Sequence, residues 1–147
     1  MEKPFTFEEF RAIYSKVPRL CVIVVVKTNK GIVLALRKLS SWNNLWHIPG
    51  GTVYYKETMH DAVRRVASDE LGISVRIKDC LGYIDAYPSE EKEVGFGSTV
   101  SLVFLCEIKK GRLMPNEDAS EIKIFKKLPK NMIAEEKEYL KKINFGI

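Results

Sequence analysis

A pair of adjacent carboxylates near the end of an amphipathic segment is the first feature of the sequence that could do chemistry. Asp69 and Glu70 lie three and four positions after Val66, so on a helix the three side chains share one face. Two carboxylates on one helix edge can bind a divalent cation, and hard oxygen ligands select Mg²⁺ or Mn²⁺ over softer metals. Taken alone, an acidic pair is also typical of a solvated helix face.

Residues before this segment could complete a site for a cation and its ligand. Pro49-Gly50-Gly51 predicts a tight turn, which brings backbone carbonyls and amides close to a ligand. Glu57 and Arg65 are two helical turns apart, so they can meet only if Glu57 lies off the helix and folds back. Arg65 would then hold the loop against the helix through a charge-assisted hydrogen bond.

The helix that must position the acidic pair is the clearest element of the sequence. It is predicted over residues 58–71, with Thr58 as the N-cap, Asp61 in the first turn and Gly72 closing the C-terminus. Two more helices are predicted, over residues 6–15 and 131–143.

Strands are predicted between these helices, over residues 20–26, 32–37, 75–83, 99–108 and 122–125, and the first two form a hairpin. Strands separated by helices favour an α/β fold in which helices pack on both faces of a mixed sheet. The polar, glycine-containing stretch 87–98 is predicted to be a mobile loop.

Composition indicates one globular domain, because 147 residues with 46% hydrophobic and 29% charged residues can bury a core. No stretch is long and apolar enough to span a membrane, and no signal peptide is apparent, which predicts a cytoplasmic protein. The net charge of +5 comes from lysines interspersed with glutamates, so a small anionic substrate is expected rather than a specific nucleic acid. Cys21, Cys80 and Cys106 are predicted to be buried free thiols.

The spacing as a whole resembles the box of the Nudix hydrolase family. That box has Gly, five residues, Glu, seven residues, Arg-Glu, an aliphatic residue, any residue, Glu-Glu, any residue, Gly and an aliphatic residue. The matching residues span 51–73 and are Gly51, Glu57, Arg65, Asp69, Glu70, Gly72 and Ile73. Three other segments also resemble the corresponding parts of Nudix proteins. They are residues 45–51 directly before the box, the strand 32–37 that ends in arginine, and the strand 120–125. The resemblance therefore predicts a single Nudix domain over residues 1–147.

The resemblance implies an α/β/α sandwich that hydrolyses a nucleoside diphosphate linked to another group, with Mg²⁺ or Mn²⁺ as cofactor. Glu70 would be a metal ligand, Asp69 a second ligand, and the carbonyls of Gly50 and Gly51 further ones. Glu57 and Arg65 would support the site.

Val66 departs from the box, which has glutamate at this position, and Asp69 is one methylene shorter than the usual glutamate. The GDP-mannose mannosyl hydrolases, which attack the sugar carbon, also carry an apolar residue there. The helical segment 6–17 and the loop 41–46 resemble that branch as well. In that branch the N-terminal segment contributes to a dimer, so a homodimer is expected here.

The histidines of that branch are absent at the matching positions, and His47 and His60 are predicted to be packed or surface residues. Glu117 and Asp118, followed by Glu121, are the better candidates for the general base, because their loop faces the metal site in the family. Arg37 could contact a phosphate or form a surface salt bridge. Tyr87, like Tyr54 and Tyr55, could stack on a base or sugar, or be packed surface.

Three functions remain open from the sequence. The first is hydrolysis of a nucleotide sugar such as GDP-mannose. The second is pyrophosphohydrolysis of a nucleoside triphosphate or of ADP-ribose. The third is a Nudix-fold nucleotide-binding or regulatory module with reduced catalysis.

Overall fold

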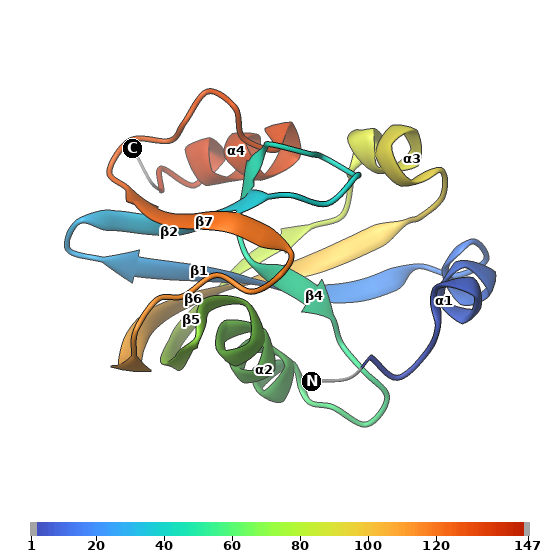
Figure 1. The fold of residues 1–147 in the computed structure, drawn as a ribbon, viewed down its shortest axis with the longest axis horizontal. Coiled ribbons are helices and arrows are strands. Elements are labelled where there is room, and N and C mark those ends of the chain that lie inside the picture. Colours follow the sequence, from blue (N-terminus) through green and yellow to red (C-terminus); the bar gives the residue numbers. More distant parts are fainter. Residues whose placement is uncertain (1–2, 146–147) are drawn as a thin grey trace.

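The fold is an α/β/α sandwich, as expected. A computed structural model describes residues 3–145, and within them seven strands form a mixed sheet with helices on both faces (Figure 1). The main path of the sheet runs β3-β2-β1-β6-β5, while β4 pairs with β1 and β7 pairs with β2. The bounds of the strands are Arg19–Thr28 (β1), Gly31–Arg37 (β2), Trp46–His47 (β3), Gly50–Thr52 (β4), Ile73–Ile84 (β5), Thr99–Gly111 (β6) and Ala119–Phe125 (β7).

Strand β1 is the centre of the domain because both of its faces are buried. Its even-numbered valines, Val22, Val24 and Val26, pack in the core cluster that includes α2. Ile23 and Val25 point the opposite way, into the cluster that includes α4. This alternation follows from the two-residue period of a strand, and it explains the continuous apolar run. β1 runs parallel to β6 and antiparallel to β2 and β4.

Helix α2 (Met59–Leu71) confirms the predicted helix. Thr58 caps it by accepting a hydrogen bond from the Asp61 backbone N–H, and Gly72 ends it with φ of 70°. The positive φ suits glycine because a side chain there would be strained. The apolar face is fully covered by the sheet and comprises Ala62, Val63, Val66, Ala67 and Leu71.

Helix α4 (Ala134–Lys142) covers the opposite face and starts three residues later than predicted. The preceding residues are extended because they pair with β3: Met132 forms a bridge with Trp46, and the Ile133 N–H donates to the Trp46 carbonyl at 3.0 Å. β3 and the start of α4 are thereby joined.

The predicted tight turn at Gly50-Gly51 is wrong, because these residues belong to strand β4, paired with Ile23 and Val22 of β1. Glycine is required at Gly50 for close approach rather than for positive φ. A Cβ atom there would lie 2.7 Å from the Val22 carbonyl oxygen. The backbone of β4 can therefore lie directly against β1 only without a side chain at this position.

The prediction of a mobile loop over residues 87–98 is also wrong, because Pro88–Val94 form helix α3. Proline at its first turn fits a helix start, and Gly95 ends it with φ of 92°. Tertiary hydrogen bonds then fix a segment that is too short to be a stable helix alone.

Helix α1 (Phe7–Tyr14) forms where it was expected, with a capping box between Thr6 and Glu9. It has no buried residue, and Phe7 is 65% exposed. Its ring contacts run to Phe96, which lies 6.0 Å from Phe10 between ring centroids. The expected homodimer through this segment stays a prediction.

Cys21 and Cys106 are buried free thiols as predicted, but Cys80 is exposed. The pairing of β5 with β6 is irregular on both sides of Cys80, and the preceding residues Lys78 and Asp79 are exposed as well. Within residues 3–145, no helix has the length and apolar character needed to cross a membrane.

Candidate active site

A cleft of about 630 Å³ brings most of the predicted site residues together. It lies where β1 and β4 meet α2, α3 and α4. The predicted residues that line it are Arg37, Gly50, Gly51, Arg65, Asp69, Glu70, Tyr87, Glu117 and Asp118. Glu57 lies outside this lining and acts through Arg65, while Glu121 is an exposed position of β7 opposite Leu36.

The pair of Glu57 and Arg65 confirms the predicted fold-back of the loop. Arg65 Nε and Nη2 donate to the two carboxylate oxygens of Glu57 at 2.7 and 3.0 Å. The same guanidinium donates to the Thr52 carbonyl at 2.7 Å, and the Tyr54 N–H donates to Glu57 at 3.0 Å. The hydrogen bond from Arg65 lowers the pKa of Glu57. This bidentate contact fixes the end of β4 against α2.

The acidic edge of α2 lies in the cleft. Burial, followed by the nearby Asp118 carboxylate, raises the pKa of Glu70 to about 8, although the Arg37 and Arg65 guanidinium groups lower it. Asp69 adds further negative charge. A carboxyl group in this position is poorly stabilised in its charged form, and a cation is the partner that would reverse this.

The donor set fits one hard divalent cation. Among the described residues, no three His, Cys, Asp or Glu side chains are grouped as metal ligands. Two adjacent carboxyls and the backbone carbonyls of β4 leave positions for water and phosphate oxygens, as Mg²⁺ prefers. Asp69 and Glu70, with Gly50 and Gly51, would hold the ion.

Val66 lies below this edge and belongs to the core. It is 1% exposed, and a Cβ atom on Gly51 would lie 3.3 Å from its Cγ2. Val66 also lines the cleft, so this position presents an apolar side chain between α2 and β4.

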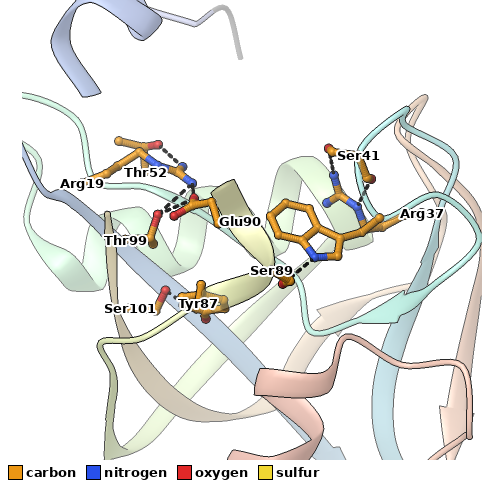
Figure 2. A network of polar contacts seen from close by, with 10 residues as sticks. Arg19, Arg37, Ser41, Thr52, Tyr87, Ser89, Glu90, Thr99 and Ser101 are labelled. Carbon is orange, nitrogen blue, oxygen red and sulfur yellow. Dashed lines mark hydrogen bonds and ion pairs between the residues drawn. The ribbon is translucent and has the colours of Figure 1, made fainter. Parts of the chain in front are cut away.

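Arg37 ends β2 and lies over the indole ring of Trp42, 5.4 Å from the ring centroid. Its Nε donates to the Ser41 carbonyl at 3.0 Å, and its Nη2 donates to Ser41 Oγ at 2.9 Å (Figure 2). Burial lowers its pKa, while Glu136, Glu70 and Asp118 raise it. Arg37 is thus a fixed positive charge inside the cleft and not a surface salt bridge.

The opposite side of the cleft contains a polar network that the sequence did not predict. Glu90 of α3 is 5% exposed, and its Oε2 accepts from Thr99 Oγ1 at 2.6 Å and from Arg19 Nη2 at 3.4 Å. Arg19 also donates to Thr52 Oγ1 at 2.9 Å (Figure 2). This network joins α3 to β1, β4 and β6.

Further contacts hold α3 in place. Ser89 Oγ accepts from the Trp42 indole N–H at 2.9 Å and donates to Glu135 of α4 at 2.9 Å. Tyr87, directly before α3, donates to Ser101 Oγ at 3.3 Å. Tyr87 is therefore a half-buried wall of the cleft.

Two other residues of the cleft were not assigned a role from the sequence. Glu136 of α4 is buried and accepts from the Ile48 N–H at 2.8 Å. His47 is half-buried, and burial followed by Arg37 lowers its pKa to about 3, so its imidazole is neutral. His60 is exposed and does not line the cleft. The only sequence signal for Glu136 is a glutamate at a buried helix position, which periodicity alone cannot distinguish from the exposed glutamates around it.

Comparison with known proteins agrees with this geometry. The family model described as NUDIX domain matches residues 17–143. The chain is 31% identical over 120 residues to the low-salt glycan biosynthesis protein Agl8 of Haloferax volcanii, covering 80% of this chain and 77% of that protein. It is 30% identical over 122 residues to the ADP-ribose pyrophosphatase of Methanocaldococcus jannaschii, covering 82% and 70%.

Solved structures share the fold. The MutT Nudix hydrolase of Burkholderia pseudomallei aligns with a TM-score of 0.73 at 23% identity, covering 85% of this chain and 97% of that one. A UDP-X diphosphatase aligns with a TM-score of 0.68 at 17% identity, covering 97% and 72%. The chain belongs to the Nudix family. With Gly51, Arg65, Asp69 and Glu70 of the box in one cleft, it is a Nudix hydrolase.

Proposed function

We propose that the chain is a divalent-metal-dependent hydrolase of nucleoside diphosphate derivatives, with a nucleotide sugar such as GDP-mannose as the first substrate to test. The observation that carries this proposal is the acidic edge of Asp69 and Glu70, which shares one cleft with the glycine backbone of β4. The cleft of about 630 Å³ is within the size range of small-molecule sites.

The proposed roles follow from the contacts. Mg²⁺ or Mn²⁺, when bound, would neutralise pyrophosphate charge and polarise the bond that breaks. Glu70 and Asp69 would hold the ion, while Glu57 and Arg65 keep β4 and α2 in register. Arg37 would attract the diphosphate to its end of the cleft.

The general base is proposed to be Asp118 rather than Glu117. Asp118 is half-buried and acts directly on Glu70 and Arg37, whereas Glu117 is exposed. The Asp118 backbone is fixed by the Lys38 N–H, which donates to its carbonyl at 3.1 Å. We expect Asp118→Asn to lower kcat by about 100-fold, within the usual range for a general base, and Glu117→Gln to change it little.

The choice of a nucleotide sugar is supported by Val66 and by the glycan-biosynthesis relative. The apolar side chain at this position removes one carboxylate from the metal site, which weakens attack at phosphorus and favours attack at the sugar carbon. The second candidate is ADP-ribose pyrophosphohydrolysis, which the relative from Methanocaldococcus jannaschii favours.

A substrate panel in ¹⁸O-labelled water tests both candidates. The protein is incubated with GDP-mannose, ADP-ribose or a nucleoside triphosphate, in Mg²⁺, Mn²⁺ or chelator. We expect mannose and GDP without ¹⁸O from GDP-mannose, which means attack at carbon, whereas ¹⁸O in GDP means attack at the β-phosphorus. GMP with mannose phosphate means attack at phosphorus. Turnover of ADP-ribose alone supports the second candidate, and tight binding with no turnover of any compound identifies a binding module.

A further inference from the structure

Thr52, the last residue of β4, is bonded to an arginine at each of its polar ends. Its carbonyl accepts from Arg65 Nη2 at 2.7 Å, and its Oγ1 accepts from Arg19 Nη1 at 2.9 Å. Arg65 belongs to α2, whereas Arg19 is the first residue of β1. With 7% exposure, Thr52 is buried between them. The end of β4 is therefore held from two directions by groups of fixed planar geometry.

Arg19 is itself fixed by a buried carboxylate. Its Nη2 donates to Glu90 Oε2 and to Thr99 Oγ1, both at 3.4 Å, and the Thr99 hydroxyl donates to the same Glu90 oxygen at 2.6 Å (Figure 2). The centre of the Phe10 ring lies 5.2 Å from the guanidinium carbon. Because a buried carboxylate without its partner is strongly unfavourable, Glu90 keeps the guanidinium in place. One nitrogen of Arg19 is thus held by α3 and β6, while another holds Thr52.

Thr52 is the residue through which the rest of β4 can be fixed. The strand comprises Gly50, Gly51 and Thr52, and it pairs with residues 21–23 of β1. The two glycines have no side chains, and their backbone has more conformational freedom than that of other residues. The direction of their carbonyls therefore depends on the pairing with β1 and on the anchored residue that follows them.

We propose that Arg19 and Glu90 are positioning residues for the divalent cation, and that they act through the Thr52 hydroxyl on the carbonyls of the two β4 glycines. Arg65 holds the Thr52 carbonyl from the α2 side, and Arg19 with Glu90 holds its side chain from the α3 side. Groups that orient metal ligands without touching the ion have a strong effect on its affinity. This inference rests on the proposed function, because it assumes that the two glycine carbonyls face the bound ion.

The variants Thr52→Val and Thr52→Ser test this role through Mn²⁺ affinity, which needs no turnover. Valine keeps the branched shape of threonine but removes the hydroxyl that Arg19 holds, while serine retains it. We expect the Kd for Mn²⁺, measured by the paramagnetic resonance signal of the free ion, to rise about 10-fold in Thr52→Val, as for other groups that support metal ligands. Thr52→Ser should bind Mn²⁺ as the wild type does. The matched control is Thr28→Val at the opposite end of β1, where the hydroxyl donates to the Gly31 carbonyl.

Glu90→Gln tests whether α3 acts along the same path. Glutamine keeps an oxygen for the Thr99 hydroxyl but removes the charge that holds Arg19, so the Kd for Mn²⁺ should rise, by at most the roughly 10-fold of Thr52→Val. In the Thr52→Val background, Glu90→Gln should raise the Kd no further, because the hydroxyl that links Arg19 to β4 is already absent. Urea denaturation in metal-free buffer shows whether each variant is folded, and the two Thr52 variants decide the proposal if Glu90→Gln does not fold.

Three results would contradict the proposal. An unchanged Kd for Mn²⁺ in Thr52→Val overturns it. An equal rise in Thr52→Ser also overturns it, because the hydroxyl would then not be the group that matters. A further rise in the double variant overturns the role of Glu90, because that carboxylate would then act on the ion by another route.

Mn²⁺ binding separates this inference from the proposed function. If the wild type binds Mn²⁺ and hydrolyses a nucleotide while Thr52→Val binds Mn²⁺ equally well, only this inference fails. If the wild type binds Mn²⁺ but hydrolyses no nucleotide, the proposed hydrolysis fails and the Kd comparison still decides this inference. If the wild type does not bind Mn²⁺, both fail.

Discussion

The cleft has two walls, one formed by α2 and one by α3 and α4. The hydrogen-bond partners that build them differ greatly in their separation along the sequence. On the α2 wall, Arg65 bonds to Glu57 and Thr52, which lie 8 and 13 residues before it. On the α3 and α4 wall, the partners are 71 residues apart for Arg19 and Glu90, and 88 residues apart for Ile48 and Glu136. A short motif can therefore encode the first wall, whereas the second exists only after the chain has folded.

Each wall presents one carboxyl whose pKa is raised to about 8 by burial: Glu70 on α2 and Glu136 on α4. The difference lies in their neighbours. Glu70 has the carboxylates of Asp118 and Asp69 near it as well as the guanidinium groups of Arg37 and Arg65, while Glu136 accepts a hydrogen bond from a backbone N–H. Under the proposed function, the first wall would face the metal ion and the diphosphate.

The largest expected effect is a loss of stability in the variant Val66→Glu, whose position lies between the α2 wall and the core. Val66 is 1% exposed and packs against Gly51, so an ionised side chain there has no partner. We expect a loss of about 3 kcal/mol in the free energy of unfolding in metal-free buffer, measured by urea denaturation. Val66→Ile is the apolar control. Val66 also lines the cleft, so a variant as stable as wild type would show that the Glu side chain reaches the water or cations of the cleft.

Glu70→Gln should abolish the metal-dependent step on the same wall. We expect kcat/KM to fall by about 100-fold or more, because the ion provides several kcal/mol of charge stabilisation. Chelator should reduce wild-type turnover to the same level, and Mg²⁺ or Mn²⁺ should restore the wild type alone. Metal-induced thermal stabilisation supplies a second readout. Full activity of Glu70→Gln would remove Glu70 from the metal site.

The difference in sequence separation between the contacts of the two walls also explains which features the sequence could predict. The two faces of β1, the caps of α2 and the fold-back of Glu57 follow from periodicity and local chemistry, and the structure contains them. Helix α3 was missed because its stability comes from partners such as Arg19, Thr99 and Glu135, which are remote in the chain.

Gly50 illustrates the same limit within the motif itself. Its residue type indicated a turn, but the need for glycine arises from the Val22 carbonyl across the sheet, which the local sequence does not show. Glu136 likewise has no local pattern that separates it from Glu135 or Glu138. Only the position of α4 against β3 reveals that its side chain enters the cleft.

Arg65→Lys tests whether the α2 wall depends on geometry as well as charge. Lysine keeps the positive charge but cannot bond to Glu57 through two nitrogens and reach the Thr52 carbonyl as well. We expect kcat/KM to fall by about 10- to 100-fold, the usual range for residues that support metal ligands. Arg64→Lys is the neighbouring control, since Arg64 is exposed and forms an ion pair with Asp61 of the same helix at 3.6 Å. Equal activity of both variants would contradict a supporting role for Arg65.

The smallest expected effect is on the pH dependence of the unfolding free energy, through Glu136 on the wall formed by α3 and α4. The pKa of Glu136 in the folded protein, about 8, exceeds its ordinary value of 4.5, so the folded state binds more protons across this interval. Unfolding free energy should therefore fall as pH rises from about 4.5 to 8. The groups acting on Glu136 are the Ile48 N–H, Arg37 of β2 and Glu135 of α4, and Tyr87 also faces it.

Glu136→Gln removes this titration while keeping the bond to Ile48, so its stability should depend less on pH than that of the wild type. In chelator and without nucleotide, the variant should be more stable at pH 8 by about 1.4 kcal/mol, the equivalent of one pKa unit. Urea denaturation between pH 5 and 8 measures the difference, with Glu138→Gln as the exposed control. Identical slopes for the wild type and Glu136→Gln would mean that the Ile48 N–H and Arg37 already stabilise the Glu136 carboxylate fully in its charged form. Glu136 would then not be the counterpart of Glu70, whose pKa burial also raises.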